Sequence, residues 1–472
     1  MEFFRRNRYF TMAMPKPSSL LTAVILVAAV AIFFTPPPAG VTVNVMHTGA
    51  LLVLVMGLWA IGSLPEYFVA LIFFTLAVLL EVATPTVIFS GFASGTLWLV
   101  LGGLVIAEAV RSTGLGERIA RLALGEETLS YRKLVTAAVL VSLLLSFLMP
   151  ATVAHILLLV PIFAAVAERH GLARDSMGYA GVMLATILAT FQCGTAILPA
   201  NAPNLVLAGA AETLYGVQLI YAEYLWAQFP VMGLAKGWLI IVMVCWLCPA
   251  ETQTATTAAA LPPMSAEEKR LAVIVFASLA LWATDFLHGI RPGWIALAAA
   301  VIAMMPRIGA VPVTMFQERV RFGTFFYIGG ILGLGAVMIE TGLSVAIGNA
   351  VLSLIRLEPG ADAANFAVLS LLSTFAGLIT TNPSQPALLA PLAGHFAEAT
   401  GWPLKTALMT SAIGFSTVIL PYQVPPVVVG LQVAHLSVQT AMRVTVPLAA
   451  ISIVALIPLN YVWWRLIGYF GK

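Results

Sequence analysis

The chain has 472 residues, of which 61% are hydrophobic and only 9% charged, and its mean hydropathy is +1.00. A soluble domain carries about 25% charged residues, so this chain cannot cover a water-facing surface. Apolar runs of about 20 residues, the length that spans a bilayer, recur from end to end. The composition therefore predicts an all-α polytopic protein embedded in a lipid bilayer. It excludes soluble enzymes and nucleic-acid-binding proteins.

The first predicted element is an apolar run near 18–35 that follows the basic residues Arg5, Arg6, Arg8 and Lys16. A basic segment before an apolar run is typical of a signal peptide. The small-residue cleavage pattern is missing, however, and TPPPAG follows at 35–40. We therefore expect an uncleaved first span with a cytoplasmic N-terminus, in the inner (plasma) membrane.

The remaining elements follow in chain order, separated by Gly, Pro and charged residues. Spans are predicted near 47–63, 66–83, 96–111, 225–248, 271–288, 292–306, 322–341 and 443–465. Two longer apolar stretches, about 133–170 and 363–398, carry MPATVAH and TTNPSQP at their centres. Two others, about 178–210 and 404–437, are interrupted by LPANAPN and LPYQVPP. These four stretches are too irregular for single continuous helices.

A long apolar stretch with a polar centre is either two full spans or a re-entrant hairpin. With two hairpins and two broken helices, the chain crosses the bilayer about 11 times. Most Lys and Arg residues then lie on the side of the N-terminus, as the positive-inside rule requires. If each hairpin crossed the membrane fully twice, these charges would lie on the same sides. The charges therefore fix the orientation of the chain in the membrane but not the depth of the hairpins.

The two halves of the chain resemble each other. The segment from Thr96 aligns with the segment from Thr324, and Thr-Gly-Leu recurs at 113–115 and 341–343. The charge pattern places the first hairpin on the cytoplasmic side and the second on the outer side. Such an inverted repeat is typical of a secondary transporter with its site near the middle of the membrane. The predicted domains are 1–95 (scaffold helices), 96–248 (repeat 1), 249–270 (cytoplasmic linker), 271–321 (scaffold helices) and 322–472 (repeat 2).

The hairpin tips and helix interruptions are the predicted substrate site. Irregular backbone at membrane depth is tolerated only where it lines a cavity. A half-helix that begins there presents free N–H groups to an anion, and unwound carbonyls can bind a cation. The polar side chains at these places are Thr152, His155, Thr381, Asn382, Ser384 and Gln385 at the tips, and Asn201, Asn204, Tyr422 and Gln423 at the interruptions.

Structural alternatives stay open for these residues. Asn382 could cap a helix, and Asn201 and Asn204 could satisfy loop backbone. His155 could carry a proton, contact substrate or simply pack. The six histidines are isolated and show no metal-ligand spacing, so the sequence does not predict an intramembrane enzyme.

These features resemble the divalent anion:sodium symporter family, which comprises dicarboxylate, citrate and sulfate carriers. The likeness extends from about residue 45 to 465. The tips of that family carry Ser-Asn-Thr before an apolar run that ends in Pro. Counting back from Pro161 places Ala151, Thr152 and Val153 on the first motif. The same count from Pro391 places Thr381, Asn382 and Pro383 on the second, and only Asn382 is retained.

The resemblance implies roles for particular residues. Substrate contacts would be Thr152, Val153, Asn382 and Pro383. Sodium, as the coupling ion, would bind near Ala151, Thr152 and Asn201, and near Thr381, Asn382 and Val424. No other cofactor is implied. One branch of this family, which resembles plastid 2-oxoglutarate/malate translocators, has Arg at the position that His155 occupies here. The family also implies an elevator mechanism and a homodimer.

The sequence therefore predicts a secondary carrier of a small anion, such as a di- or tricarboxylate or sulfate. Transport could be coupled to sodium or protons, or could proceed by exchange. The alternative within the same superfamily is a cation/proton antiporter or an oxyanion efflux protein. A cation antiporter needs a buried carboxylate, and neither the tips nor the interruptions contain Asp or Glu.

Overall fold

A computed structural model describes residues 19–38, 40–124, 129–149, 151–253 and 262–471. The basic residues before the first span, and positions 254–261 of the predicted linker, lie outside the described residues. The described chain is helical throughout and contains no strand. Nine of its helices are long and apolar enough to cross a membrane, and several shorter apolar helices accompany them. The all-α polytopic fold is confirmed.

The first half begins with six helices, of which α4 and α6 are short: α1 (Ser19–Phe34), α2 (Val43–Ile61), α3 (Glu66–Leu79), α4 (Pro85–Ile88), α5 (Gly95–Thr113) and α6 (Leu115–Leu124). The first hairpin and the first broken helix follow, as α7 (Tyr131–Leu148), α8 (Thr152–Arg169), α9 (Met177–Leu188) and α10 (Ala202–Tyr215). The next span joins α11 (Tyr221–Gln228) to α12 (Lys236–Leu247) through a π-helical turn.

The second half starts with the helices α13 (Ala266–Ala283), α14 (Asp285–His288), α15 (Pro292–Met304), α16 (Thr314–Glu318), α17 (Phe322–Glu340) and α18 (Leu343–Leu354). The second hairpin contains α19 (Asp362–Ile379), α20 (Ser384–Leu389) and α21 (Ala393–Thr400). The second broken helix and the last span are α22 (Leu404–Phe415), α23 (Pro425–Val433), α24 (Val438–Ile451) and α25 (Ile457–Leu466).

Most predicted spans match these helices to within a few residues, with one difference at the linker. The linker was expected to reach residue 270, but α13 already begins at Ala266. Ser265 accepts a hydrogen bond from the N–H of Glu268, whose carboxylate accepts one from the N–H of Ser265. This capping box starts the helix earlier than hydropathy alone indicates.

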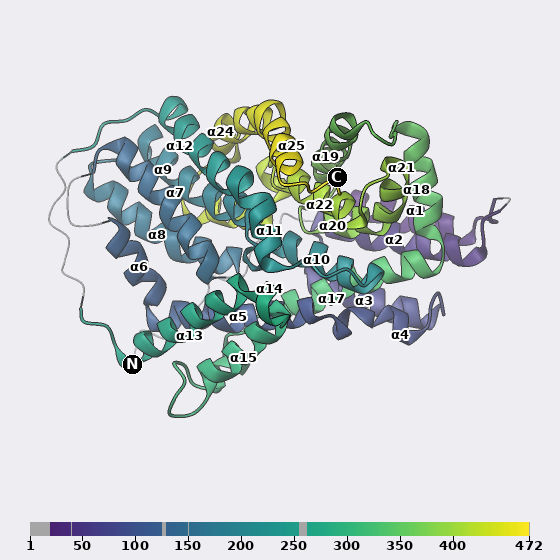
Figure 1. The fold of residues 1–472 in the computed structure, drawn as a ribbon, viewed down its shortest axis with the longest axis horizontal. Coiled ribbons are helices and arrows are strands. Elements are labelled where there is room, and N and C mark those ends of the chain that lie inside the picture. The colour runs from purple at the N-terminus through teal and green to yellow at the C-terminus, as the bar shows by residue number, and fades with distance from the viewer. Residues whose placement is uncertain (1–18, 39, 125–128, 150, 254–261, 472) are drawn as a thin grey trace.

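We divide the helices into two packing groups, which meet where α10 packs on α5 and α17. In one, α5 packs along α15, α17 along α3, and α1 along α2; Figure 1 shows α5, α13 and α15 together at the lower edge. The close approach of α5 and α15 depends on Gly293, because a Cβ there would overlap the carbonyl of Gly95. The other group contains α7–α12 and α19–α25, in which α23 packs on α8 and α12 on α24.

Both broken helices are interrupted where the sequence predicts. We call the segment 189–201, between α9 and α10, the first break, and the segment 416–424, between α22 and α23, the second break. Pro203 and Pro425 lie in the first turns of α10 and α23. Proline fits a first turn because the N–H it lacks has no helical partner there. The breaks therefore end one half-helix and begin another inside the protein.

Candidate substrate site

The first hairpin tip meets the first break. Thr152, the first residue of α8, donates a hydrogen bond from its hydroxyl to Asn201 Oδ1 at 2.8 Å and to the carbonyl of Ala200 at 3.1 Å. Asn201 Nδ2 in turn donates to the carbonyl of Phe191 at 2.8 Å. Thr152 and Asn201 are 7% and 2% exposed. The tip therefore ends within the helix bundle, which supports a re-entrant hairpin.

Two further predicted residues lie beside this contact. Asn204 donates from Nδ2 to the carbonyl of Ile197 at 2.8 Å, while its Oδ1 has no hydrogen-bond partner among the described residues. His155 is buried one turn into α8, and its Nε2 likewise has no partner in the described part of the chain. Val153 is half-buried in the same turn and adds only apolar surface.

The second tip meets the second break in a similar way. Asn382 is fully buried and donates from Nδ2 to the carbonyl of Phe415, at the end of α22, at 2.6 Å. Its own N–H donates to the carbonyl of Gln423 at 2.9 Å. Gln423 Oε1 accepts from the N–H groups of Ile419 and Leu420, at 2.8 and 2.7 Å. A tip and a break are thus joined by hydrogen bonds in both halves.

Asn382 does not act as a helix cap. The residue before α20 is Pro383, and no side chain caps this helix. The side chain of Asn382 instead bridges two segments far apart in sequence, which a local cap cannot do. Pro383 is buried at the tip without a side-chain polar atom.

The second tip also carries hydroxyl groups, one of which lies close to a tyrosine of α17. The hydroxyls of Thr381 and Ser384 lie 2.9 Å apart, and Ser384 Oγ lies 3.4 Å from the hydroxyl of Tyr327 on α17. Sequence reasoning missed Tyr327, because it lies in an ordinary Gly-rich span. Tyr422 is exposed and donates to the carbonyl of Leu378.

Gln385 also belongs to this tip. Its Nε2 donates to Asn382 Oδ1 at 3.3 Å. Its Oε1, and Nε2 of Gln423, have no partner within the described ranges. Gly377 of α19 lies against both amides: a Cβ there would overlap Gln385 Nε2 and lie 2.8 Å from Gln423 Nε2.

Helices from the two halves of the chain pack on each other around the site. Helix α23 packs on α8 and α9, and α10 packs on α20 and α22. Buried polar atoms without partners are costly, and each half holds such atoms beside its tip, as do other parts of the described chain. A polar ligand, an ion or water can supply the missing partners of the atoms beside the tips. Ala151 and Val424, in the predicted sodium sites, lie directly before α8 and α23; sodium binding there stays a prediction.

No group of three or more His, Cys, Asp or Glu side chains that could hold a metal occurs in the described part of the chain. The polar groups of the site are amides, hydroxyls, one imidazole and backbone N–H groups at the start of half-helices. Such groups suit a carboxylate or another small oxyanion.

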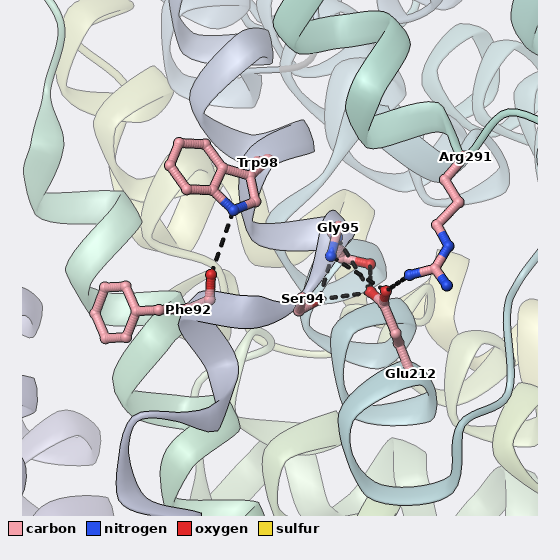
Figure 2. A network of polar contacts seen from close by, with 7 residues as sticks. Phe92, Ser94, Gly95, Trp98, Glu212 and Arg291 are labelled. Carbon is pink, nitrogen blue, oxygen red and sulfur yellow. Dashed lines mark hydrogen bonds and ion pairs between the residues drawn. The ribbon is translucent and has the colours of Figure 1, made fainter. Parts of the chain in front are cut away.

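A second polar cluster, which the sequence reasoning missed, joins the two packing groups (Figure 2). The carboxylate of Glu212, near the end of α10, accepts from Ser94 Oγ at 2.6 Å and from the N–H groups of Gly95 and Thr96 at 3.1 and 3.2 Å. Arg291, before α15, donates to it at 2.6 Å. A cavity of about 120 Å³ beside this Glu212 clasp is lined by Leu198 of the first break.

We expect Glu212→Gln to lower the melting temperature of the purified protein. The amide cannot keep the ion pair with Arg291 or accept charge-assisted hydrogen bonds at the start of α5. The loss of one such charged acceptor costs about 1–2 kcal/mol when it is partly exposed. The matched control is Glu117→Gln, which removes an exposed ion pair with Arg121. Equal melting temperatures for the two variants would contradict a stabilising role of the Glu212 clasp.

Comparison with known proteins places the chain in a family. The family model described as the transmembrane region of sodium:sulfate symporters matches residues 18–470. A "Membrane protein" of Cupriavidus necator is 29% identical over 80% of this chain and 76% of its own length. The "L-tartrate/succinate antiporter" of Escherichia coli K12 is 23% identical over 71% of this chain and 72% of its own length.

A solved structure shares the fold. The crystal structure of the Alcanivorax borkumensis YdaH transporter superposes with a TM-score of 0.57 at 15% identity, and covers 82% of this chain and 88% of that one. At this identity the likeness concerns the fold alone. The match of the family model over nearly the whole sequence confirms the family resemblance. The chain belongs to the sodium:sulfate symporter family, of the divalent anion:sodium symporter type, and is a membrane anion transporter.

Proposed function

We propose that the protein is a secondary carrier that exchanges small divalent carboxylates, with C4-dicarboxylates as the first substrates to test. The observation that carries this proposal is the paired arrangement of tips and breaks. Each half buries amide or hydroxyl groups beside the start of a half-helix, and neither tip nor break contributes an acidic side chain. An anion bound between them finds donors on both sides and no repelling carboxylate.

The name of one relative supports exchange. The Escherichia coli protein is called an L-tartrate/succinate antiporter, and both of its named substrates are dicarboxylates of four carbons. The departures from Ser-Asn-Thr at both tips leave fewer hydroxyl and amide groups than the family motif provides. We therefore expect a compact dianion to be preferred over citrate.

We propose that the protein transports its substrate by an elevator movement, in which one group of helices slides against the other. The group α7–α12 with α19–α25 would carry the site, and the group α1–α5 with α13–α18 would stay fixed. The Glu212 clasp, which joins α10 to α5 and Arg291, would then open once in each cycle. We further propose that the protein works as a homodimer in the inner membrane, with its N-terminus in the cytoplasm.

The test is uptake of labelled succinate by purified protein in proteoliposomes. One set is preloaded with unlabelled succinate and another is empty, both in choline chloride. We expect rapid uptake only into the preloaded vesicles, and competition by external tartrate or malate. Parallel sets with an inward sodium gradient or a proton gradient test for ion-coupled transport. A further set with labelled sulfate tests the other substrate class.

Uptake into empty vesicles that requires sodium would mean that the protein is a sodium symporter and not an exchanger. Transport of sulfate but not succinate would change the substrate class. Failure of folded protein to transport either anion under any gradient would overturn the proposal.

A further inference from the structure

A lysine lies buried in the middle of a predicted membrane span. Lys236 begins α12, within the continuous span Tyr221–Leu247, and its side chain is fully buried. A charged group at this depth is costly and is usually kept for function. Neither the family motifs nor the proposed contacts of the tips use this residue.

The ammonium group of Lys236 binds the second break. Its Nζ donates to the carbonyl of Ser416 at 2.7 Å and lies 3.4 Å from Ser416 Oγ. Ser416 directly follows the last residue of α22, whose carbonyl accepts the amide of Asn382. Lys236 and the second tip therefore hold neighbouring carbonyl groups at the same helix end.

The oxygens that contact Lys236 lie at the end of a helix. The last carbonyls of a helix lack helical donors and lie at the negative end of its dipole. In transporters with broken helices, such carbonyls coordinate the coupling cation. Here the oxygens of Ser416 are bound by an ammonium that is tethered to the chain. Both hydrogen bonds described for this ammonium end on uncharged oxygens of that one residue.

Lys236 also lies next to the first break. A Cβ on the adjacent Gly237 would come within 3.5 Å of Cys193 Sγ, in the first break. The π-helical turn before Lys236 contacts the same segment. The backbone of α12 beside Lys236 therefore packs against the first break, while the ammonium itself binds the second break.

We propose that Lys236 is a resident cation that replaces a mobile coupling ion at the second break. Because the positive charge of Lys236 is held at the Ser416 carbonyl, the second break needs no sodium to bind the anion. The inference rests on the proposed function and deepens it, because a carrier with a permanent cation at this position would exchange anions without a sodium gradient. Lys236 is a positioning residue, which acts on the substrate through Ser416 and the second tip.

The test compares Lys236→Ala, which vacates the position, with Lys236→Gln, which fills it without charge. Exchange of labelled succinate is measured in choline chloride and in sodium chloride of equal concentration. The melting temperature of each protein is measured in the same two salts, which gives a readout independent of transport. Lys133→Ala is the matched control, because Lys133 is exposed at the start of α7.

For the wild type and Lys133→Ala we expect exchange and melting temperature to be the same in both salts. Lys236→Ala should lose about tenfold or more of its exchange in choline. Sodium should restore a part of that exchange and raise the melting temperature, because the ion can enter the vacated position. Lys236→Gln should lose exchange without response to sodium.

Three results would overturn the inference. The first is undiminished exchange by Lys236→Gln in choline. The second is a melting temperature of Lys236→Ala that does not respond to sodium. The third is a wild-type carrier that needs sodium, which would contradict the resident cation while leaving anion transport intact. If the wild type transports no anion at all, the proposed function fails, but the melting temperatures still decide whether sodium can take the place of Lys236.

Discussion

Replacement of Asn382 by alanine is expected to reduce anion exchange more than any other single change at the tips. Asn382 is fully buried, and its amide joins the second tip to the carbonyl of Phe415 while accepting from Gln385. The variant leaves that carbonyl and the Gln385 amide without their partner. Each such buried group costs about 1–3 kcal/mol, so the initial rate of succinate exchange should fall at least about tenfold.

The control for this variant lies on the same hairpin. Asn365 is equally buried, in the first turn of α19, and its side chain exchanges two hydrogen bonds with the backbone of Glu358. Asn365→Ala removes a comparable pair of bonds away from the tip. It should lower the melting temperature but keep the exchange rate per folded molecule. Equal loss of exchange in both variants would show that Asn382 supports only the fold of the hairpin.

The second large effect is expected for Gly377→Ala. A methyl group at this position would overlap Gln385 Nε2 and press on Gln423 Nε2. The two amides must move apart, and both belong to the polar lining of the second half-site. We expect a several-fold increase in the KM for succinate, because the displaced amides no longer face the anion as a preformed pair.

Gly49→Ala provides the comparison for Gly377→Ala. Gly49 lies in α2, and a Cβ there would meet its nearest neighbours, Ile32 and Leu343, at an ordinary 3.9 Å. This substitution should leave the KM unchanged and slightly favour the helix. A Gly377→Ala variant with the KM of the wild type would mean that Gln385 and Gln423 do not face the substrate.

The arrangement of helices could be predicted largely from the sequence, for physical reasons. Hydropathy marks spans directly, and Pro and polar residues in apolar stretches mark the hairpin tips at 149–155 and 380–386 and the interruptions at 198–204 and 420–426. The start of α13 was missed because hydropathy does not register a capping box. The pairing of Thr152 with Asn201 follows from the expectation that tips and breaks share one site.

The partners within the site were harder to predict. Asn382 binds the carbonyl of Phe415, and no side-chain pattern identifies a backbone acceptor 33 positions away. Tyr327 comes from an ordinary span, and Glu212 resembles a solvated acid near a helix end. Only the three-dimensional packing of α10 against α5 gives Glu212 its partners. Lys236 was visible in the sequence as a charge within a span, but its contact with Ser416 was not.

The most direct test of the two-part site is equilibrium binding of labelled succinate to detergent-solubilised protein, without any gradient. Wild type, Thr152→Val and Asn382→Ala are compared, so that each half of the site is altered once. We predict saturable binding to the wild type and a loss of affinity of about tenfold or more in both variants. Unchanged affinity in both folded variants would contradict the claim that the two tips bind the anion together.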